Sequence, residues 1–411
     1  MMGKHWRWMV AGSLVASGAM GAGPETNRVE DVVVSATRMA TPLREVASSV
    51  TVIDRQTLDD YQSQTVADVL RRTVPGVDVN QAGGPAGSGS VFIRGSKTEQ
   101  VLVLIDGIEV NDPITPGRAF EWALLSVADI ERIEVLRGPQ STLYGSDAIG
   151  GVINIVTRQG AGDPQLTLTA EGGSFGSFLQ SATVAGGTET VNYAAGIRHF
   201  QTDGISAADE AEGNSEKDGY ENTTLSTRLG WTPTADHTVD LTVRHTDVRL
   251  EYDDFYSGVP VDADSVGNSE NLMARVQFGM RAFDERWNQK LGLSWVEYDR
   301  SDRTVYSQSA FDSESRQADW QNDLVLADWN TLTVGADYQE EKGDSTYESD
   351  LWVETFSRKS ARMTGVYLQD VIKPGPVFQT ALGVRHDDHN QAGSETTYRV
   401  APLLTLCGGQ T

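Results

Sequence analysis

Cysteine and positive charge are both scarce in this chain of 411 residues. Cysteine occurs once, as Cys407, so no disulfide can form within the chain. Lys and Arg together number 33 against 58 Asp and Glu, which gives a formal net charge of −25. Surfaces that bind nucleic acids neutralise the phosphate backbone with Lys and Arg. The composition therefore argues against nucleic acid as a partner.

Long apolar runs are also missing. After the first 23 residues, no run approaches the roughly 20 apolar residues that a membrane-spanning helix needs, and hydrophobic residues make up only 39% of the chain. A bundle of membrane-spanning helices is therefore excluded.

Residues 1–23 have the pattern of a secretory signal peptide. Lys4 and Arg7 precede the apolar stretch 8–20, and small residues follow as far as Gly23. A core helix or a membrane anchor is the alternative, but the stretch is short and rich in Gly and Ser. We expect export of the chain and cleavage just before Pro24.

Residues 29–160 have the pattern of a small mixed α+β domain. Thr65 is a typical cap for a helix that ends before Pro75 and Gly76. Short apolar runs bounded by turn residues indicate strands. The predicted strands are Val50–Ile53, Val101–Ile105, Ile130–Leu136 and Gly151–Thr157.

After residue 163 the sequence changes to two-residue alternation without a convincing helix. Leu272, Ala274 and Val276, for example, alternate with polar neighbours. This pattern fits either a soluble sheet with one wet face or a membrane barrel. Strands near ten residues long, with aromatic residues near their ends, favour the barrel.

The connections between these strands also favour the barrel, because short connections alternate with long polar ones. The short ones are near 232–237, 283–287, 327–331 and 373–376, and the long ones are near 202–222, 250–269, 300–315 and 341–357.

The first domain resembles a known family. Its motifs are VEDVVVSATR (29–38), VADVLRRTVPGVDV (66–79), VFIRG (91–95), VLVLIDGIEVND (101–112) and IERIEVLRGPQSTLYGSDAIGGVINIVTR (130–158). These motifs are similar to the plug domain of TonB-dependent outer-membrane receptors, and most similar to the cobalamin (vitamin B12) receptor branch. The YDDFYS stretch at 252–257 extends that similarity. The resemblance implies a barrel of about 22 antiparallel strands around a plug.

The chain departs from that family pattern after the plug. Residues 161–411 have room for only about a dozen strands, and the final LLTLCGGQT lacks the terminal strand with a C-terminal aromatic residue. We expect a mainly β protein with part of a transmembrane antiparallel barrel and a C-terminally incomplete sequence. A closed 12-stranded barrel is the alternative. The predicted divisions are a signal peptide (1–23), an N-terminal segment (24–40), the plug (41–160) and the barrel part (161–411).

The N-terminal segment contains an extended, β-branched stretch that could add as a strand to the sheet of another protein. The resemblance implies that it is the TonB box, which engages the energy-coupling protein TonB. The alternative is a first strand of the plug itself. The predicted box consists of Asp31, Val32, Val33, Val34, Ser35 and Ala36.

Two plug loops, 81–90 and 111–118, are rich in Gly, Pro and Ser. By resemblance they form the floor of the ligand site, although ordinary surface loops are the alternative. The predicted ligand contacts are Gly84, Ser88, Ser90, Asn111 and Thr115.

Two predicted external loops, 203–221 and 247–270, carry seven acidic side chains each. A hard cation with six to eight oxygen ligands would relieve their mutual repulsion, and cobalamin receptors hold calcium in corresponding loops. Solvated acidic loops are the alternative. The residues at matching positions are Glu216, Asp218, Tyr252, Asp253, and either Asp262 or Asp264.

No enzymatic interpretation has a firm motif. Gly172, Ser174 and Gly176 satisfy G-x-S-x-G but fall in a hairpin rather than a strand-to-helix elbow. His386–His389 adjoin a strand end and are better explained as an exposed polar cap than as a metal cluster.

The predicted function is therefore active uptake of a scarce large ligand, most similar to cobalamin uptake. The implied partners are TonB, cobalamin or a related chelate, outer-membrane lipid and the barrel assembly machinery. A ferric-siderophore receptor of the same family is one alternative. A non-transporting exported β-sheet protein, such as an adhesin, is the other.

Overall fold

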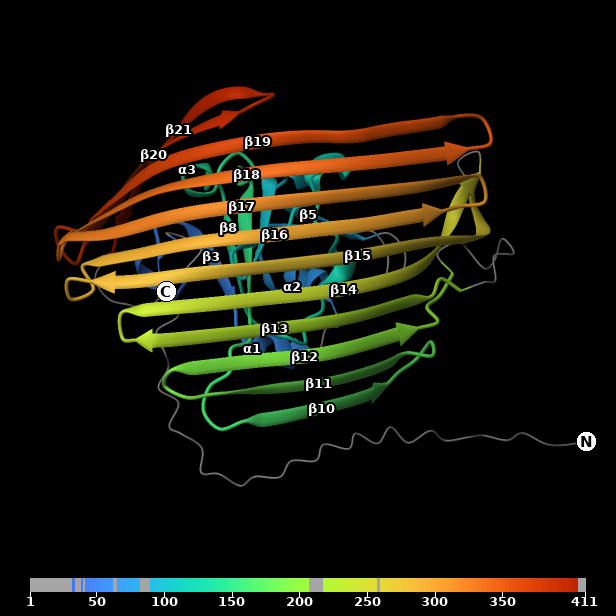
Figure 1. The fold of residues 1–411 in the computed structure, drawn as a ribbon, viewed down its shortest axis with the longest axis horizontal. Coiled ribbons are helices and arrows are strands. Elements are labelled where there is room, and N and C mark those ends of the chain that lie inside the picture. The colour runs from blue at the N-terminus through green and yellow to red at the C-terminus, as the bar shows by residue number, and fades with distance from the viewer. Residues whose placement is uncertain are drawn as a thin grey trace, which may run out of the picture.

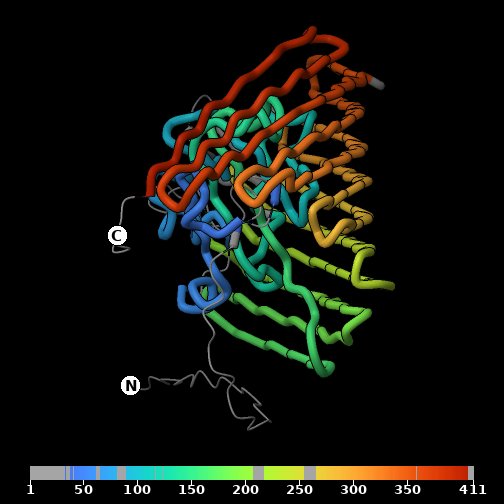
Figure 2. Tube along the Cα trace, turned by 90° about the vertical axis from the view of Figure 1, so that its left-hand side faces the viewer, coloured from blue at the N-terminus to red at the C-terminus, as the bar shows by residue number. Residues whose placement is uncertain are grey.

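The computed structural model describes residues 32–33, 38–39, 41–61, 65–81, 89–206, 217–256 and 259–405. These residues form a long, curved antiparallel sheet, which we call the wall, and a smaller mixed α/β domain, which we call the plug. Figures 1 and 2 show the plug lying on the concave side of the wall. Wall side chains that contact the plug, such as Arg244 and Tyr298, therefore project from the concave face.

The plug is built around a five-stranded sheet in the order β3-β8-β9-β6-β7, in which only β6 and β9 run parallel. Its strands are β3 (Ser49–Ile53), β6 (Val101–Ile105), β7 (Ile108–Glu109), β8 (Ile130–Arg137) and β9 (Gly151–Thr157). A separate hairpin pairs β4 (Val77–Gln81) with β5 (Gly89–Ile93). The helices are α1 (Arg55–Tyr61), α2 (Val66–Thr73) and α3 (Ser141–Tyr144), with 3₁₀ turns at Leu43–Glu45, Thr98–Gln100, Pro116–Arg118 and Trp122–Leu124.

The predicted α+β pattern of the plug is confirmed. All five residues of β6 are buried, as a continuous apolar run predicts. Thr65 caps α2, because its side-chain oxygen accepts a hydrogen bond from the backbone N–H of Asp68 at 3.3 Å. Helix α1 was not predicted, because Leu58 is the single aliphatic residue in RQTLDDY and gives no helical period.

The wall has twelve strands, and each is hydrogen-bonded to the next in sequence. They are β10 (Gln165–Gly172), β11 (Phe178–Gly187), β12 (Val191–Thr202), β13 (Tyr220–Thr234), β14 (His237–Tyr256), β15 (Val259–Ala282), β16 (Trp287–Arg303), β17 (Ser307–Ala327), β18 (Asn330–Ser349), β19 (Val353–Ile372), β20 (Phe378–His389) and β21 (Gly393–Leu404). Within this sheet β10 and β21 are the two edges and do not pair with each other. The alternative of a closed 12-stranded barrel is therefore wrong for the described strands.

The central strands are much longer than the predicted ten residues. Strand β15 has 24 residues, and β14, β18 and β19 have 20 each. The long connections predicted near 250–269, 300–315 and 341–357 are wrong, because most of these residues belong to the paired strands β14–β19. Beyond the apolar band both faces of a strand are polar, so the two-residue period disappears while backbone pairing continues.

The two faces of the wall have opposite character. Large apolar side chains project from the convex face, including Leu293 at 58% exposure and Val276 at 47%. The concave face buries polar side chains, among them Arg244, Asn271 and Arg275. This arrangement confirms the predicted apolar-out, polar-in alternation of a membrane barrel. In the part of the chain that is described, no helix has the length and apolar character needed to cross a bilayer.

Candidate functional site

Among the described residues, four ion pairs join the plug to four different strands of the wall, and a fifth joins Glu45 to Lys373 just after β19. Three plug carboxylates pair with wall arginines, and one plug arginine pairs with a wall carboxylate. The pairs are Asp106–Arg228 (2.9 Å), Asp129–Arg244, Asp112–Arg300 (3.0 Å) and Arg118–Glu341 (2.6 Å). The carboxylates of Asp106 and Asp112 are only 2% and 3% exposed. Removal of one partner from such a pair would leave a buried, uncompensated charge.

The turn between β6 and β7 presents Asp106 to the wall. Asp106 has φ 50° and Gly107 has φ 81°, a left-handed geometry that glycine and aspartate tolerate best. The Asp106 carboxylate accepts hydrogen bonds from the backbone N–H of Thr157 at 3.0 Å and from Arg228 at 2.9 Å. The turn therefore ties the plug sheet to β13.

The loop 111–118 is fixed at both ends. The Asn111 amide accepts from the Val103 N–H at 2.8 Å and donates to the carbonyls of Val101 and Arg118 at 3.0 and 2.9 Å. Asp112 accepts a hydrogen bond from the hydroxyl of Ser313 on β17 at 3.0 Å, in addition to its ion pair with β16. The loop is thus held against the wall.

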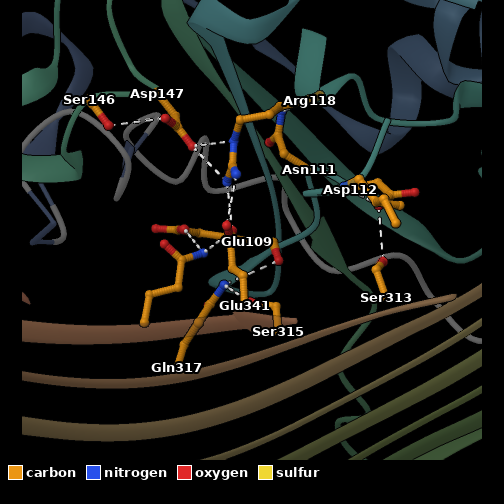
Figure 3. Close-up of polar contacts among 12 residues, drawn as sticks. Glu109, Asn111, Asp112, Arg118, Ser146, Asp147, Ser313, Ser315, Gln317 and Glu341 are labelled. Carbon is orange, nitrogen blue, oxygen red and sulfur yellow. Dashed lines mark hydrogen bonds and ion pairs between the residues drawn. The ribbon is translucent and has the colours of Figure 1, made fainter. Parts of the chain in front are cut away.

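A second cluster lies where the loop ends (Figure 3). Arg118 donates to both carboxylate oxygens of Glu341, at 2.8 and 2.6 Å, and its Nε donates to Asp147 at 3.2 Å. The Gln339 amide donates to Glu109 at 3.3 Å and to Glu341 at 3.1 Å. One guanidinium thus faces three carboxylates, so the cluster carries excess negative charge when all of them are ionised.

Glu109 is the carboxylate that relieves this excess. Burial, together with the negative charges of Asp147, Asp337 and Glu341, raises the pKa of Glu109 to about 8, against the opposing effect of Arg38. The protonated carboxyl is therefore the favoured form of Glu109 when the loop is docked.

Arg38 anchors the segment that follows the predicted TonB box. Its guanidinium lies 4.4 Å from the ring centre of Tyr144 in the plug and 5.1 Å from that of Tyr367 in the wall. It also donates to the Tyr367 hydroxyl at 3.1 Å. Lys290 and Gln321 donate to its carbonyl at 3.3 and 3.2 Å. Cation–π contacts of this kind are strongest where water is excluded.

The described part of the predicted box is itself paired. Val32 and Val33 form β1, which is antiparallel to β2 (Thr41–Pro42), and Val33 is 0% exposed. Asp31, Val34, Ser35 and Ala36 lie outside the described residues. In this state Val32 and Val33 form a short strand docked on their own chain.

The predicted ligand contacts are spread over different environments. Gly84 and Ser88 lie outside the described residues, and Ser90 lies on β5 opposite Asn80. The Thr115 hydroxyl donates to the carbonyls of Asp112 and Ala119, at 2.9 and 3.3 Å. Asn111 and Thr115 therefore shape the loop through their own hydrogen bonds.

The structure describes only part of the predicted calcium set. Asp218 is 8% exposed, and the N–H of Glu251 donates to the carbonyl of neighbouring Gly219 at 2.8 Å. The Ser206 hydroxyl donates to Asp253 at 3.3 Å, next to Tyr252. The segments that carry Asp218 and Asp253 are therefore adjacent. Glu216 lies outside the described residues, and so do the side chains of Asp262 and Asp264. Among the side chains that are described, no three acidic, His or Cys groups form a metal cluster.

The fold explains the two weaker sequence motifs, G-x-S-x-G at 172–176 and His386–His389. Ser174 lies in the turn between β10 and β11, where its carbonyl accepts from the Ser177 N–H at 3.1 Å. This confirms the hairpin that was predicted in place of a nucleophile elbow. His386 and His389 bond to Thr396 and to the turn amide of Ala392, at 2.9 and 3.0 Å.

Sequence reasoning did not find Glu109, Arg118, Glu341 or Arg38. The one available signal was an acidic residue, Glu109, within the otherwise apolar and turn-forming stretch 101–110. The pairing of Arg118 with Glu341 spans 223 residues, so no local pattern reveals it.

Comparisons with known proteins agree with this architecture. Residues 42–152 match the model of the TonB-dependent receptor plug domain, and residues 199–403 match that of the TonB-dependent receptor-like β-barrel. The chain is 30% identical over 377 residues to the vitamin B12 transporter BtuB of Photobacterium profundum, covering 91% of this chain and 59% of that protein. It is 31% identical over 388 residues to BtuB of Vibrio vulnificus, covering 91% and 60%.

Siderophore receptors are among the solved structures that match this fold. PirA of Acinetobacter baumannii has a TM-score of 0.72 at 19% identity, covering 87% of this chain and 59% of that one. FpvA of Pseudomonas aeruginosa, bound to heterologous pyoverdines, has a TM-score of 0.73 at 17% identity, covering 90% and 56%. At sequence identities this low, the similarity to these structures shows a shared fold alone.

A plug docked inside a curved wall of membrane-barrel character defines the class of outer-membrane receptor proteins. Together with the two family models, it shows that the chain belongs to the TonB-dependent receptor family. The chain spans about three fifths of the length of the curated relatives that it matches.

The Glu109 cluster predicts a pH dependence. Docking raises the pKa of Glu109 from 4.5 to about 8. The stabilisation of the docked loop is therefore fully present below about pH 4.5 and is lost as the pH rises towards 8. Native-state hydrogen exchange, corrected for intrinsic rates, should show that the opening free energy of amides 108–118 falls over this range.

A Glu109→Gln variant should lack most of that dependence, because glutamine is neutral at every pH. Glu131→Gln, at an exposed position on β8, is the matched control and should keep the wild-type profile. An unchanged pH profile in Glu109→Gln would contradict the assignment.

Proposed function

We propose that the chain is part of an outer-membrane receptor for the TonB-dependent uptake of a scarce, large ligand, and that this ligand is cobalamin or another corrinoid. The docking of the plug on the wall through buried ion pairs carries the proposal of a gated receptor. The corrinoid is supported by the vitamin B12 transporters, which are 30–31% identical over 91% of the chain. A ferric siderophore is the second candidate, because the structural neighbours are siderophore receptors.

In this proposal the plug closes the path of the ligand, and work from the periplasmic side opens it. TonB would pair with the box as an added strand. Since Val33 is buried in β1, the box must leave β2 before it can pair with TonB. Arg38 would then transmit the pull to Tyr144 in the plug and Tyr367 in the wall.

The remaining partners follow from the two faces of the wall. We expect the apolar convex face to contact outer-membrane lipid, with export directed by the signal peptide and insertion by the barrel assembly machinery. Because the family is one of receptors and transporters, no catalytic step is part of the proposal.

Titration of the purified chain in detergent tests the choice of ligand. Cyanocobalamin should bind with a Kd in the nanomolar to micromolar range, which is usual for specific large-ligand sites. Ferric enterobactin is the matched probe of the alternative. Binding of ferric enterobactin without cyanocobalamin would overturn the corrinoid proposal and leave the receptor class intact.

Coupling to TonB can be tested at Val33. A Val33→Pro variant loses a backbone N–H and should bind the isolated C-terminal domain of TonB at least about tenfold more weakly, with unchanged affinity for cyanocobalamin. Val305→Pro, in the exposed turn between β16 and β17, is the control. Equal TonB binding by wild type and Val33→Pro would refute the box assignment.

We also propose that calcium orders the segments around Asp218 and Asp253. Both carboxylates, with Tyr252, Glu216 and Asp262 or Asp264, would supply the oxygen ligands that calcium prefers. Chelation should then weaken cyanocobalamin binding, and calcium but not magnesium should restore it, since magnesium demands a tighter octahedron. Indifference to chelation, with the same affinity in the Asp218→Ala/Asp253→Ala double variant, would contradict the proposal.

A further inference from the structure

One row of side chains crosses the concave face of the wall just beyond the docked loop. Residues directly opposite one another in the ladder run from Arg300 on β16 to Phe311 on β17, Ser345 on β18 and Phe356 on β19. The next row towards the plug contains Ser313, which donates to Asp112 of the plug. Because side chains two residues apart share a face, Phe311 points to the same side as the plug.

A β-bulge extends this row. Gly343 on β18 pairs with Lys359 on β19, and Ser345 on β18 pairs with Phe356 on β19. The step between the two pairs is therefore two residues along β18 and three residues along β19. The extra residue in β19 places both Lys359 and Phe356 opposite plug-facing positions of β18. The Lys359 ammonium consequently lies 5.9 Å from the ring centre of Phe356. Without the bulge, two residues three apart would point to opposite faces.

The row continues outward as exposed aromatic surface. Tyr347, which follows Ser345 on the same face of β18, has its ring centre 6.1 Å from that of Trp352. Phe356 is 43% exposed, Tyr347 36% and Trp352 54%. Exposed aromatic side chains that gather at one end of the strands are a common feature of binding surfaces.

Each end of the row also carries a cation stacked on an aromatic ring. The Arg300 guanidinium lies 5.3 Å from the ring centre of Phe311 and is also paired with Asp112. Among the described residues, Lys359 contacts the ring of Phe356 and has no carboxylate partner. Aromatic faces flanked by cations suit a flat conjugated ligand that carries a negative charge.

We propose that Arg300, Phe311, Tyr347, Phe356 and Lys359, here called the mouth patch, form a ligand-binding site on the wall. Its ligand class is a conjugated ring system with an anionic phosphate group, a description that cobalamin, with its benzimidazole nucleotide, meets. The proposal rests on the receptor function proposed above and identifies the wall residues that contact the ligand.

The position of Arg300 links this site to the plug. Arg300 pairs with Asp112 at 3.0 Å, and Asp112 also fixes Ile114 by accepting from its N–H at 3.0 Å. A ligand phosphate that approaches Arg300 competes with Asp112 for the same guanidinium. Binding at the mouth patch therefore loosens the loop 111–118 from the wall.

Equilibrium titration of the full chain in detergent with cyanocobalamin tests the mouth patch. Phe356→Ala and Lys359→Gln should each raise the Kd by about fivefold, the usual effect of losing one stacking or cation contact. The loss in Lys359→Gln should shrink at high salt. Phe283→Ala, 74% exposed in the turn between β15 and β16, and Lys342→Gln, on the convex side of β18, are matched controls and should bind like wild type. Near-UV circular dichroism checks that each variant is folded.

The outcomes separate this inference from the proposed function. Cyanocobalamin binding that is unchanged in both variants would overturn the mouth patch and leave the receptor proposal standing. Binding of ferric enterobactin alone would overturn both the corrinoid and the ligand class proposed for the mouth patch. Binding of neither probe by the wild-type chain would count against both proposals.

Discussion

The structure depends on charges that are buried between the plug and the wall. A carboxylate such as Asp112, at 3% exposure, is stable there only because Arg300 and the Ser313 hydroxyl compensate its lost hydration. The same constraint applies to Asp106 with Arg228 and to Arg118 with Glu341. The plug can leave the wall only if these groups separate and become hydrated, which makes the docked state specific in position and sensitive to competing ions.

This constraint explains how a receptor of this kind could be both closed and responsive. The four ion pairs hold the plug from different strands, so breaking one of them releases only a local segment. The pair between Asp112 and Arg300 lies beside the mouth patch, where an anionic ligand would compete with it. At the other end of the plug, Arg38 and the strand pairing of Val33 hold the segment that TonB would pull. Ligand and partner would thus act on separate contacts of one docked domain.

The sequence predicted the α+β plug and the two-faced wall because both depend on local period and turn residues. The alternation of Leu272, Ala274 and Val276 is visible in the chain, and so is the cap at Thr65. Strand length was underestimated because polar residues occupy both faces in the outer parts of β16–β19, with only scattered aromatic residues such as Phe311 and Phe356, so no two-residue period is visible. The bulge that brings Phe356 beside Lys359, and the pairing of Arg118 with Glu341, depend on contacts between distant segments. Neither leaves a periodic signal in the sequence.

The most direct test of the account is a charge exchange at the pair between Arg118 and Glu341, read by native-state hydrogen exchange of amides 111–118. Arg118→Glu and Glu341→Arg, each alone, should lower the opening free energy of the loop by about 2 kcal/mol, because each places like charges together in a largely buried contact. The double variant should recover a good part of that loss, as expected for residues that interact directly. Single variants that exchange like the wild-type chain would contradict the claim that buried ion pairs hold the plug to the wall.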